Sequence, residues 1–205
     1  MNIKFLGASE TVTGSKTLLE IGELNFMIDS GLYQGVNDVE RLNDRPLSLN
    51  LLELDYVLLT HAHLDHCGYL PRLVRDGFKG KIICTAATRD LVELILNDSV
   101  KIQEYEMKAG TRSEFFYGSE DVNRTLELIQ VIDFNQVMKL KDCTVEFYRA
   151  GHILGAASIL ISHNNRKICF SGDLGRRDDL LHKEPVLPED FDYLVLESTY
   201  GDRCH

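Results

Sequence analysis

No apolar run in the sequence approaches the roughly 20 residues that a membrane-spanning helix needs. The first residues, Met1 to Gly7, are predicted to form a strand and lack the apolar core of a signal peptide. The five cysteines have no C-x-x-C spacing, and Cys84, Cys143 and Cys169 stand in apolar, strand-like runs. We therefore expect buried free thiols, a cytoplasmic protein in a reducing environment, and no membrane partner.

The sequence also lacks an excess of basic residues. It has 22 Lys and Arg against 32 Asp and Glu, which gives a formal net charge of −10. An acidic chain is poorly suited to a broad nucleic-acid-binding surface, because it repels phosphates. Phosphate chemistry at a bound metal ion is not excluded, because such an ion reverses the local field. The segment 7–15 is rich in glycine but lacks the glycine spacing and the Lys-Ser/Thr pair of a P-loop.

The apolar share of 44% and the charged share of 26% are typical of a globular protein, and residues 1–205 suffice for one domain. Strand-like runs flank two helix-like segments. One helix is predicted from Thr88, as N-cap, to about Lys108, and a second is predicted with Ser119 as its N-cap. The apolar stripes predicted to face the core are Leu91, Leu94, Ile95, Ile102 and Tyr105 in the first helix, and Val122, Leu126 and Ile129 in the second. Hairpins around an inserted helix pair predict an α/β sandwich with a site at its strand ends.

A dense histidine cluster follows the apolar run Tyr56–Leu59, which is predicted to be a buried strand. His61 and His63 are two residues apart, so an extended chain points them the same way. Asp65 and His66 fall where a short helix is expected, so they approach from a second direction. Imidazole and carboxylate groups are ligands that zinc, manganese and iron accept. Because the chain has only 7 His, we favour a metal site over a surface histidine cluster.

Three further polar residues share one pattern: each closes or follows an apolar strand and lies near a glycine. They are Asp29, His152 and Asp173. A strand end fixes the direction of a ligand, and a small neighbour allows close approach of the backbone. Asp29 by itself is equally well interpreted as a turn residue. Together with the histidine cluster, the three are candidates for the rest of a metal site.

The successive motifs resemble those of the metallo-β-lactamase superfamily, in the same order: His61-Ala62-His63-Leu64-Asp65-His66, Gly151-His152 and Gly172-Asp173. Four segments further resemble the β-CASP branch of that family, which includes RNA 3′-end-processing endonucleases and ribonuclease J. These segments are residues 7–15, 28–31, 151–156 and 197–203. The resemblance covers essentially the whole chain and implies an αββα sandwich.

The resemblance also implies a centre with two zinc ions. The implied ligands are His61, His63 and His152 for the first ion, Asp65 and His66 for the second, and Asp173 as a bridge between both. Asp29 would orient an imidazole ligand from behind. Glu197, after the last strand, would hydrogen-bond a histidine ligand or a water at the metal. Asp65, Asp29 and Glu197 are thus the catalytic candidates.

Family members continue into a β-CASP domain and a return segment with further histidines, whereas this chain ends at His205. We therefore expect residues 1–205 to be the N-terminal portion of a metallo-β-lactamase domain, truncated before the β-CASP insertion. A natural short form is the alternative. Such a portion would have an incomplete second metal site and could be inactive. It would lack the histidine that acts as leaving-group acid in the family, and His205 would be a weak substitute for it. Its uncovered apolar surface would favour a homo-oligomer.

These features predict a zinc-dependent hydrolase that cleaves RNA by in-line attack of hydroxide on a phosphodiester. Asp65 would orient or deprotonate the nucleophile. One alternative is a hydrolase of thioesters or lactones on the same metal core, although the ending Glu197–Gly201 speaks against it. Another is a non-catalytic assembly module.

Overall fold

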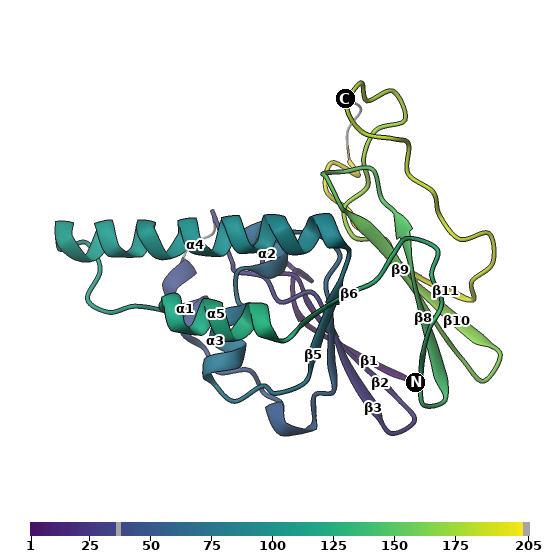
Figure 1. The fold of residues 1–205 in the computed structure, drawn as a ribbon, viewed down its shortest axis with the longest axis horizontal. Helices are drawn as coiled ribbons and strands as arrows, with labels where there is room; N and C mark the ends of the chain where they lie inside the picture. The colour runs from purple at the N-terminus through teal and green to yellow at the C-terminus, as the bar shows by residue number, and fades with distance from the viewer. Residues whose placement is uncertain (36–37, 203–205) are drawn as a thin grey trace.

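A computed structural model describes residues 1–35 and 38–202 of the chain. Two β-sheets pack face to face, and helices cover the outer face of the first sheet (Figure 1). The expected α/β sandwich is confirmed. Within the described ranges no helix follows residue 127, so they do not contain the second helical layer of an αββα arrangement. Residue 203, the last of the segment 197–203, and His205 lie outside the described residues.

The first sheet has six strands in their order along the chain. They are β1 (Asn2–Gly7), β2 (Lys16–Ile21), β3 (Leu24–Ile28), β4 (Tyr56–Leu58), β5 (Lys81–Cys84) and β6 (Ile129–Val131). β1, β2 and β3 pair antiparallel, whereas β3 to β6 run parallel. Ile129 therefore begins a strand, and its assignment to the apolar stripe of the second helix is wrong.

The parallel strands are connected by crossovers that contain the helices. These are α1 (Val39–Asp44), a 3₁₀ turn (Leu51–Glu53), α2 (Leu64–Cys67), α3 (Leu70–Arg75), α4 (Ala86–Ala109) and α5 (Ser119–Glu127). The side chain of Thr85 accepts a hydrogen bond from the Thr88 N–H at the start of α4. Thr85 is therefore the N-cap, and the prediction that Thr88 takes this position is wrong. The prediction of Ser119 as the N-cap of α5 is also wrong, because Gly118 takes that position and its N–H donates to Asp121 Oδ2.

The buried face of α4 differs in part from the predicted one, although Leu91 and Ile95 pack against the core as predicted. The buried face consists of Thr88, Val92, Leu96, Val100 and Gln103. Leu94, Ile102 and Tyr105, which we expected in the core, are 64%, 50% and 75% exposed. Gln103 can be buried because its side-chain oxygen accepts a hydrogen bond from the Phe116 N–H. The direction from which the sheet meets the helix, and not apolar content alone, selects the buried face.

The second sheet has the order β11-β10-β9-β8-β7. Its strands are β7 (Met138–Leu140), β8 (Cys143–Arg149), β9 (Ala157–His163), β10 (Arg166–Phe170) and β11 (Tyr193–Val195). β7 to β10 pair antiparallel, and β11 joins β10 in parallel. β8 and β10 both run opposite to β9, so their carboxyl ends lie at the same edge of the sheet.

Two apolar cores hold these layers together. One lies between the helices and the first sheet and contains Val57 of β4. The other lies between the sheets, where Leu58 of β4 meets Phe147 of β8 and Ile159 of β9. β4 is thus buried on both faces, which explains its uninterrupted apolar sequence. The free cysteines of the three strand-like runs are buried as expected, and Cys67 is also free and buried.

The edges that carry the carboxyl ends of β4 and β8 are joined directly. The backbone N–H of Ala157, the first residue of β9, donates to the carbonyl of Thr60 at 2.9 Å. Thr60 lies two residues after β4. The loops that follow β3, β4, β8 and β10 therefore meet at one end of the sandwich. None of the helices in residues 1–35 and 38–202 has the length and apolar composition that crossing a membrane requires.

We predict that Phe147→Ala lowers the free energy of unfolding by about 3–5 kcal/mol, because it opens a cavity between the sheets. The matched control is Leu94→Ala on the solvent face of α4, for which we expect a loss below about 0.5 kcal/mol. Equilibrium unfolding in urea measures both values. Equal losses for the two variants would contradict the assignment of the inter-sheet core.

Candidate metal centre

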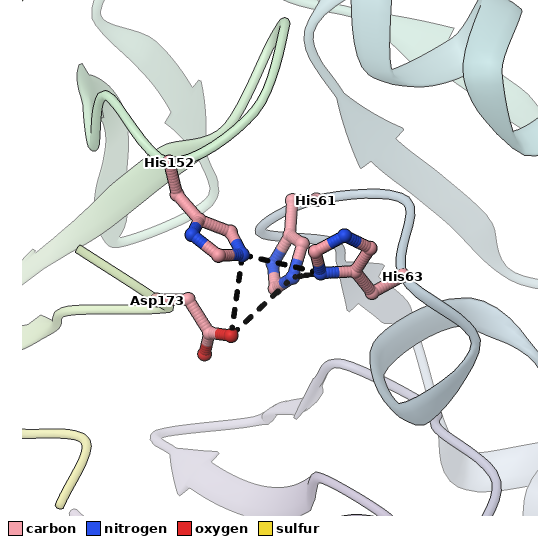
Figure 2. Close-up of side chains that lie close together, drawn as sticks. All are labelled: His61, His63, His152 and Asp173. Atoms are coloured by element: carbon pink, nitrogen blue, oxygen red, sulfur yellow. Dashed lines mark hydrogen bonds and ion pairs between the residues drawn. The ribbon is translucent and has the colours of Figure 1, made fainter. Parts of the chain in front are cut away.

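Four side chains from separate parts of the chain converge at this end of the sandwich (Figure 2). His61 and His63 lie in the loop between β4 and α2, His152 lies in the loop after β8, and Asp173 lies in the loop after β10. One ligand atom from each lies within 4.8 Å of the others. The structure thus brings together residues that are up to 112 positions apart in the sequence (173 − 61).

The distances between these atoms match those around a small tetrahedral cation. His63 Nδ1 lies 3.0 Å from His61 Nε2 and 3.1 Å from His152 Nε2. Asp173 Oδ2 lies 3.7 Å from His61 Nε2 and 3.5 Å from His152 Nε2. Tetrahedral zinc with bonds of about 2.0–2.1 Å would separate its ligand atoms by about 3.3 Å. The donor set and its spacing therefore fit a metal ion.

A second group of potential ligands adjoins the first. His66 Nε2 lies 3.3 Å from Asp173 Oδ1 and 3.8 Å from Asp65 Oδ2. Asp65 and His66 belong to the short helix α2, as the sequence predicted. The two oxygens of Asp173 therefore face different histidine groups: Oδ2 faces the group shown in Figure 2, and Oδ1 faces His66.

The Asp29 carboxylate lies behind the second group and is buried. Its Oδ2 is 2.7 Å from His66 Nδ1, so it fixes the orientation of that ring. Asp29 follows β3 in the left-handed conformation, at φ 58°, which few residues other than glycine, asparagine and aspartate adopt readily. This contact supports the predicted positioning role of Asp29.

Thr60 is a contact residue that the sequence analysis missed. Its backbone N–H donates to Asp29 Oδ1 at 2.7 Å, and its hydroxyl lies 3.0 and 2.9 Å from the two carboxylate oxygens. The same hydroxyl lies 3.0 Å from His61 Nδ1. Thr60 stands directly before the histidine cluster, but only the tertiary structure brings Asp29 against it.

Glu197 contacts the loop that carries Asp173. Its Oε1 accepts a hydrogen bond from the Leu174 N–H at 2.5 Å, and its own N–H donates to Ser171 Oγ at 3.0 Å. The resemblance implied a hydrogen bond to a histidine ligand or a water. In the structure, Glu197 bonds the backbone of Leu174, next to Asp173, and the side chain of Ser171.

The three histidines of the first group are held in the neutral form. Burial, together with neighbouring histidines, lowers the pKa of His61 well below its ordinary value. The same causes lower the pKa of His152 to about 4, and burial lowers the pKa of His63. A neutral imidazole has a free lone pair, which is the form that binds a metal.

At the second group, neighbouring carboxylates raise the pKa of a histidine, His66. Burial alone would lower the pKa of His66, but the charges of Asp29, Asp173 and Asp65 outweigh it and raise this pKa to about 9. Burial and the nearby carboxylates, including Glu197, raise the pKa of Asp173 to about 6. An uncompensated negative potential of this kind favours cations.

Close backbone packing positions α2 against the strands. The Asp65 carbonyl accepts a hydrogen bond from the Ser15 N–H at 2.8 Å. A Cβ atom at Gly31 would lie only 1.6 Å from that carbonyl oxygen. Only glycine allows this approach. A cleft of about 760 Å³ opens beside the centre, between the loop of residues 7–12 and residues 194–199.

The sequence of this chain matches those of known proteins. The family model described as "Metallo-beta-lactamase superfamily" matches residues 12–199. Ribonuclease TTHA0252 of Thermus thermophilus is 37% identical over the whole chain, which covers 45% of that protein. Cleavage and polyadenylation specificity factor 73 of Drosophila melanogaster is 34% identical over the whole chain, which covers 29% of it. These matches confirm the resemblance to an RNA-processing branch of the family, and the chain spans less than half of either relative.

Solved structures confirm the fold. A HARLDQ-motif mutant of a metallo-beta-lactamase from Cronobacter sakazakii superposes with a TM-score of 0.53. The alignment covers 87% of this chain and 62% of that one, at 18% sequence identity. At this identity the likeness concerns the arrangement of sheets and helices alone.

We predict that Gly31→Ala displaces α2 and weakens metal binding at Asp65 and His66 by at least about tenfold, because Cβ would overlap the Asp65 carbonyl. Gly118→Ala is the matched control, since no atom lies within 4 Å of a Cβ at Gly118. Metal affinities measured by chelator competition test the prediction. Equal affinities in both variants would contradict it.

We predict that Asp29→Asn moves the pKa of His66 in the metal-free protein from about 9 to roughly 7 or lower, because the main charge that stabilises the imidazolium is removed. The raised pKa contributes stability that is fully present below about pH 6.5 and is lost as the pH rises through about 9. The variant should lose most of this pH dependence. NMR titration of His66 measures it, and an unchanged pKa would contradict the role of Asp29.

Proposed function

The chain belongs to the metallo-beta-lactamase superfamily, and from this premise we propose that it provides the metal-binding core of a zinc-dependent RNA phosphodiester hydrolase. The observation that carries the proposal is the placement of Asp173. Its two carboxylate oxygens face two separate groups of imidazole and carboxylate ligands. A carboxylate shared in this way suits two divalent ions held side by side.

The proposed ligands follow from the contacts above. His61, His63 and His152 would hold one ion, Asp65 and His66 would hold the other, and Asp173 would contact both. Nitrogen-rich and carboxylate donors without a thiolate suit zinc. That the metal is zinc and that two ions bind is proposed. The fit of the donor atoms to a metal is an observation of the structure.

The charge of the centre explains why metal ions are needed for an anionic substrate. Four carboxylates surround it: Asp29, Asp65, Asp173 and Glu197. They would repel an RNA phosphate unless cations offset them. Once bound, the ions would supply Lewis-acid chemistry, because they acidify water and offset negative charge that develops at the phosphate.

The residues of the chain would have distinct roles in the reaction. Asp65 is partly exposed at the centre. It would accept a proton from the attacking water and orient the water so that an oxygen lone pair points at phosphorus. Asp29 would keep His66 in position through its 2.7 Å contact. Glu197 would keep the Asp173 loop in position through the Leu174 N–H. Asp29 and Glu197 are therefore positioning residues in this proposal.

RNA is the proposed substrate class because the relatives carry names such as ribonuclease and cleavage and polyadenylation specificity factor. Hydrolysis of a thioester or lactone is the alternative for the same metal core. A non-catalytic assembly module is a further alternative, but the presence of His61, His63, Asp65, His66, His152 and Asp173 disfavours it for the whole protein. Whether the chain cleaves RNA by itself is also open to test, because it spans less than half of those relatives.

The environment of the protein forms part of the proposal. The free, buried cysteines among the described residues suit a reducing compartment, and we propose the cytoplasm. Exposed apolar side chains, such as Leu194 and Leu196 beside the cleft, are compatible with self-association. Size-exclusion chromatography with light scattering tests for a homo-oligomer.

We predict that His63→Ala and Asp173→Ala each reduce RNA cleavage and metal content, with rates falling by more than about 100-fold, because each removes a direct metal ligand. His163→Ala is the matched control, since that histidine lies at the far end of β9 and contacts Asp142. Cleavage assays on RNA and on a thioester, with elemental analysis, measure these effects.

The outcomes separate the alternatives. Turnover of RNA but not of the thioester supports the proposed function, and the reverse supports the small-molecule hydrolase. A wild-type protein that contains no metal and cleaves neither substrate would contradict the proposed function. Unchanged cleavage in His63→Ala would overturn the ligand assignment.

A further inference from the structure

We propose that Thr60 is a positioning residue. Its hydroxyl fixes the tautomer of His61 and links the two halves of the metal centre, which are the first ligand group, with His61, and the second, with His66. This inference rests on the proposed metal-binding function. Thr60 is 1% exposed, so water does not compete for its hydroxyl. Its Oγ1 lies 2.9 and 3.0 Å from the Asp29 oxygens and 3.0 Å from His61 Nδ1.

The direction of each hydrogen bond follows from counting protons. A carboxylate accepts only, and a hydroxyl has one proton to donate. The Thr60 hydroxyl therefore donates to Asp29 and can only accept at His61. This requires that His61 Nδ1 bears the ring proton and donates it to Thr60 Oγ1. The lone pair of the neutral ring is then on Nε2, which is the atom that faces His63 and Asp173.

The same carboxylate serves the second half of the centre. Asp29 Oδ2 accepts the hydrogen bond from His66 Nδ1 at 2.7 Å. A continuous path thus runs from His66 through Asp29 and Thr60 to His61. Each histidine has its Nδ1 held by this path and its Nε2 directed at the ligand groups. His66 is held directly by the carboxylate, whereas His61 is held only through the Thr60 hydroxyl.

The backbone of Thr60 is fixed independently of its side chain. Its N–H donates to Asp29, and its carbonyl accepts from Ala157. Thr60→Val keeps the branched shape and these backbone bonds but replaces the hydroxyl by a methyl group. In that variant the His61 Nδ1 proton has no acceptor, so the ring loses its preference for the tautomer with a free Nε2.

The decisive experiment compares zinc affinities at the two halves of the centre in wild type, Thr60→Val and Thr60→Ser, by competition with a chelator. We expect Thr60→Val to weaken the site of His61 by roughly tenfold or more and to leave the site of His66 nearly unchanged. Thr60→Ser retains the hydroxyl and should rescue the affinity. Thr125→Val is the matched control, because Thr125 is equally buried and its hydroxyl bonds the Asp121 carbonyl within α5.

Long-range ¹H–¹⁵N NMR of the metal-free protein gives a second test, and its wild-type result does not depend on how the variant folds. We expect His61 to carry its proton on Nδ1, and Thr60→Val to shift the ring toward the Nε2–H form. A wild-type ring protonated on Nε2 overturns the inference. Unchanged zinc affinity at both sites in Thr60→Val also overturns it, while a wild-type protein that binds no zinc overturns the proposed function instead.

Discussion

The buried carboxylate of Asp29 lies where β3 ends, and three donors converge on it: the backbone N–H of Thr60, the Thr60 hydroxyl and His66 Nδ1. A buried, charged acceptor is costly unless it is fully hydrogen-bonded, so this constraint keeps the loops after β3 and β4 and helix α2 in one arrangement. The orientation of the histidines in both halves of the centre depends on it. The left-handed backbone of Asp29 persists because these contacts hold it.

The sandwich brings residues that are far apart in the sequence to one location. Parallel pairing in the first sheet and the alternation of β8, β9 and β10 in the second place several strand ends at one edge. The hydrogen bond from Ala157 to Thr60 then joins the two edges. Rigid strands, packed on both faces as β4 is, anchor the short loops that carry the ligands.

Part of this arrangement was readable from the sequence. The apolar run of β4, the histidine cluster after it and the polar residues near strand ends predicted a metal site. They did so because ligand type and strand periodicity are local properties. The buried face of α4 could not be fully predicted from the sequence. Leu94 and Tyr105 are apolar but exposed, whereas Gln103 is polar and buried, because partners far away in the sequence determine which face packs.

The order of residues along the chain specifies which side chains are available to hold a metal. How these side chains meet depends on the fold. It directs the two oxygens of Asp173 at different histidine groups, places Glu197 on the Leu174 backbone, and makes Thr60 a link between Asp29 and His61. These contacts join residues that are up to 112 positions apart (173 − 61). Their geometry depends on the packing of two sheets, which no local pattern in the sequence encodes.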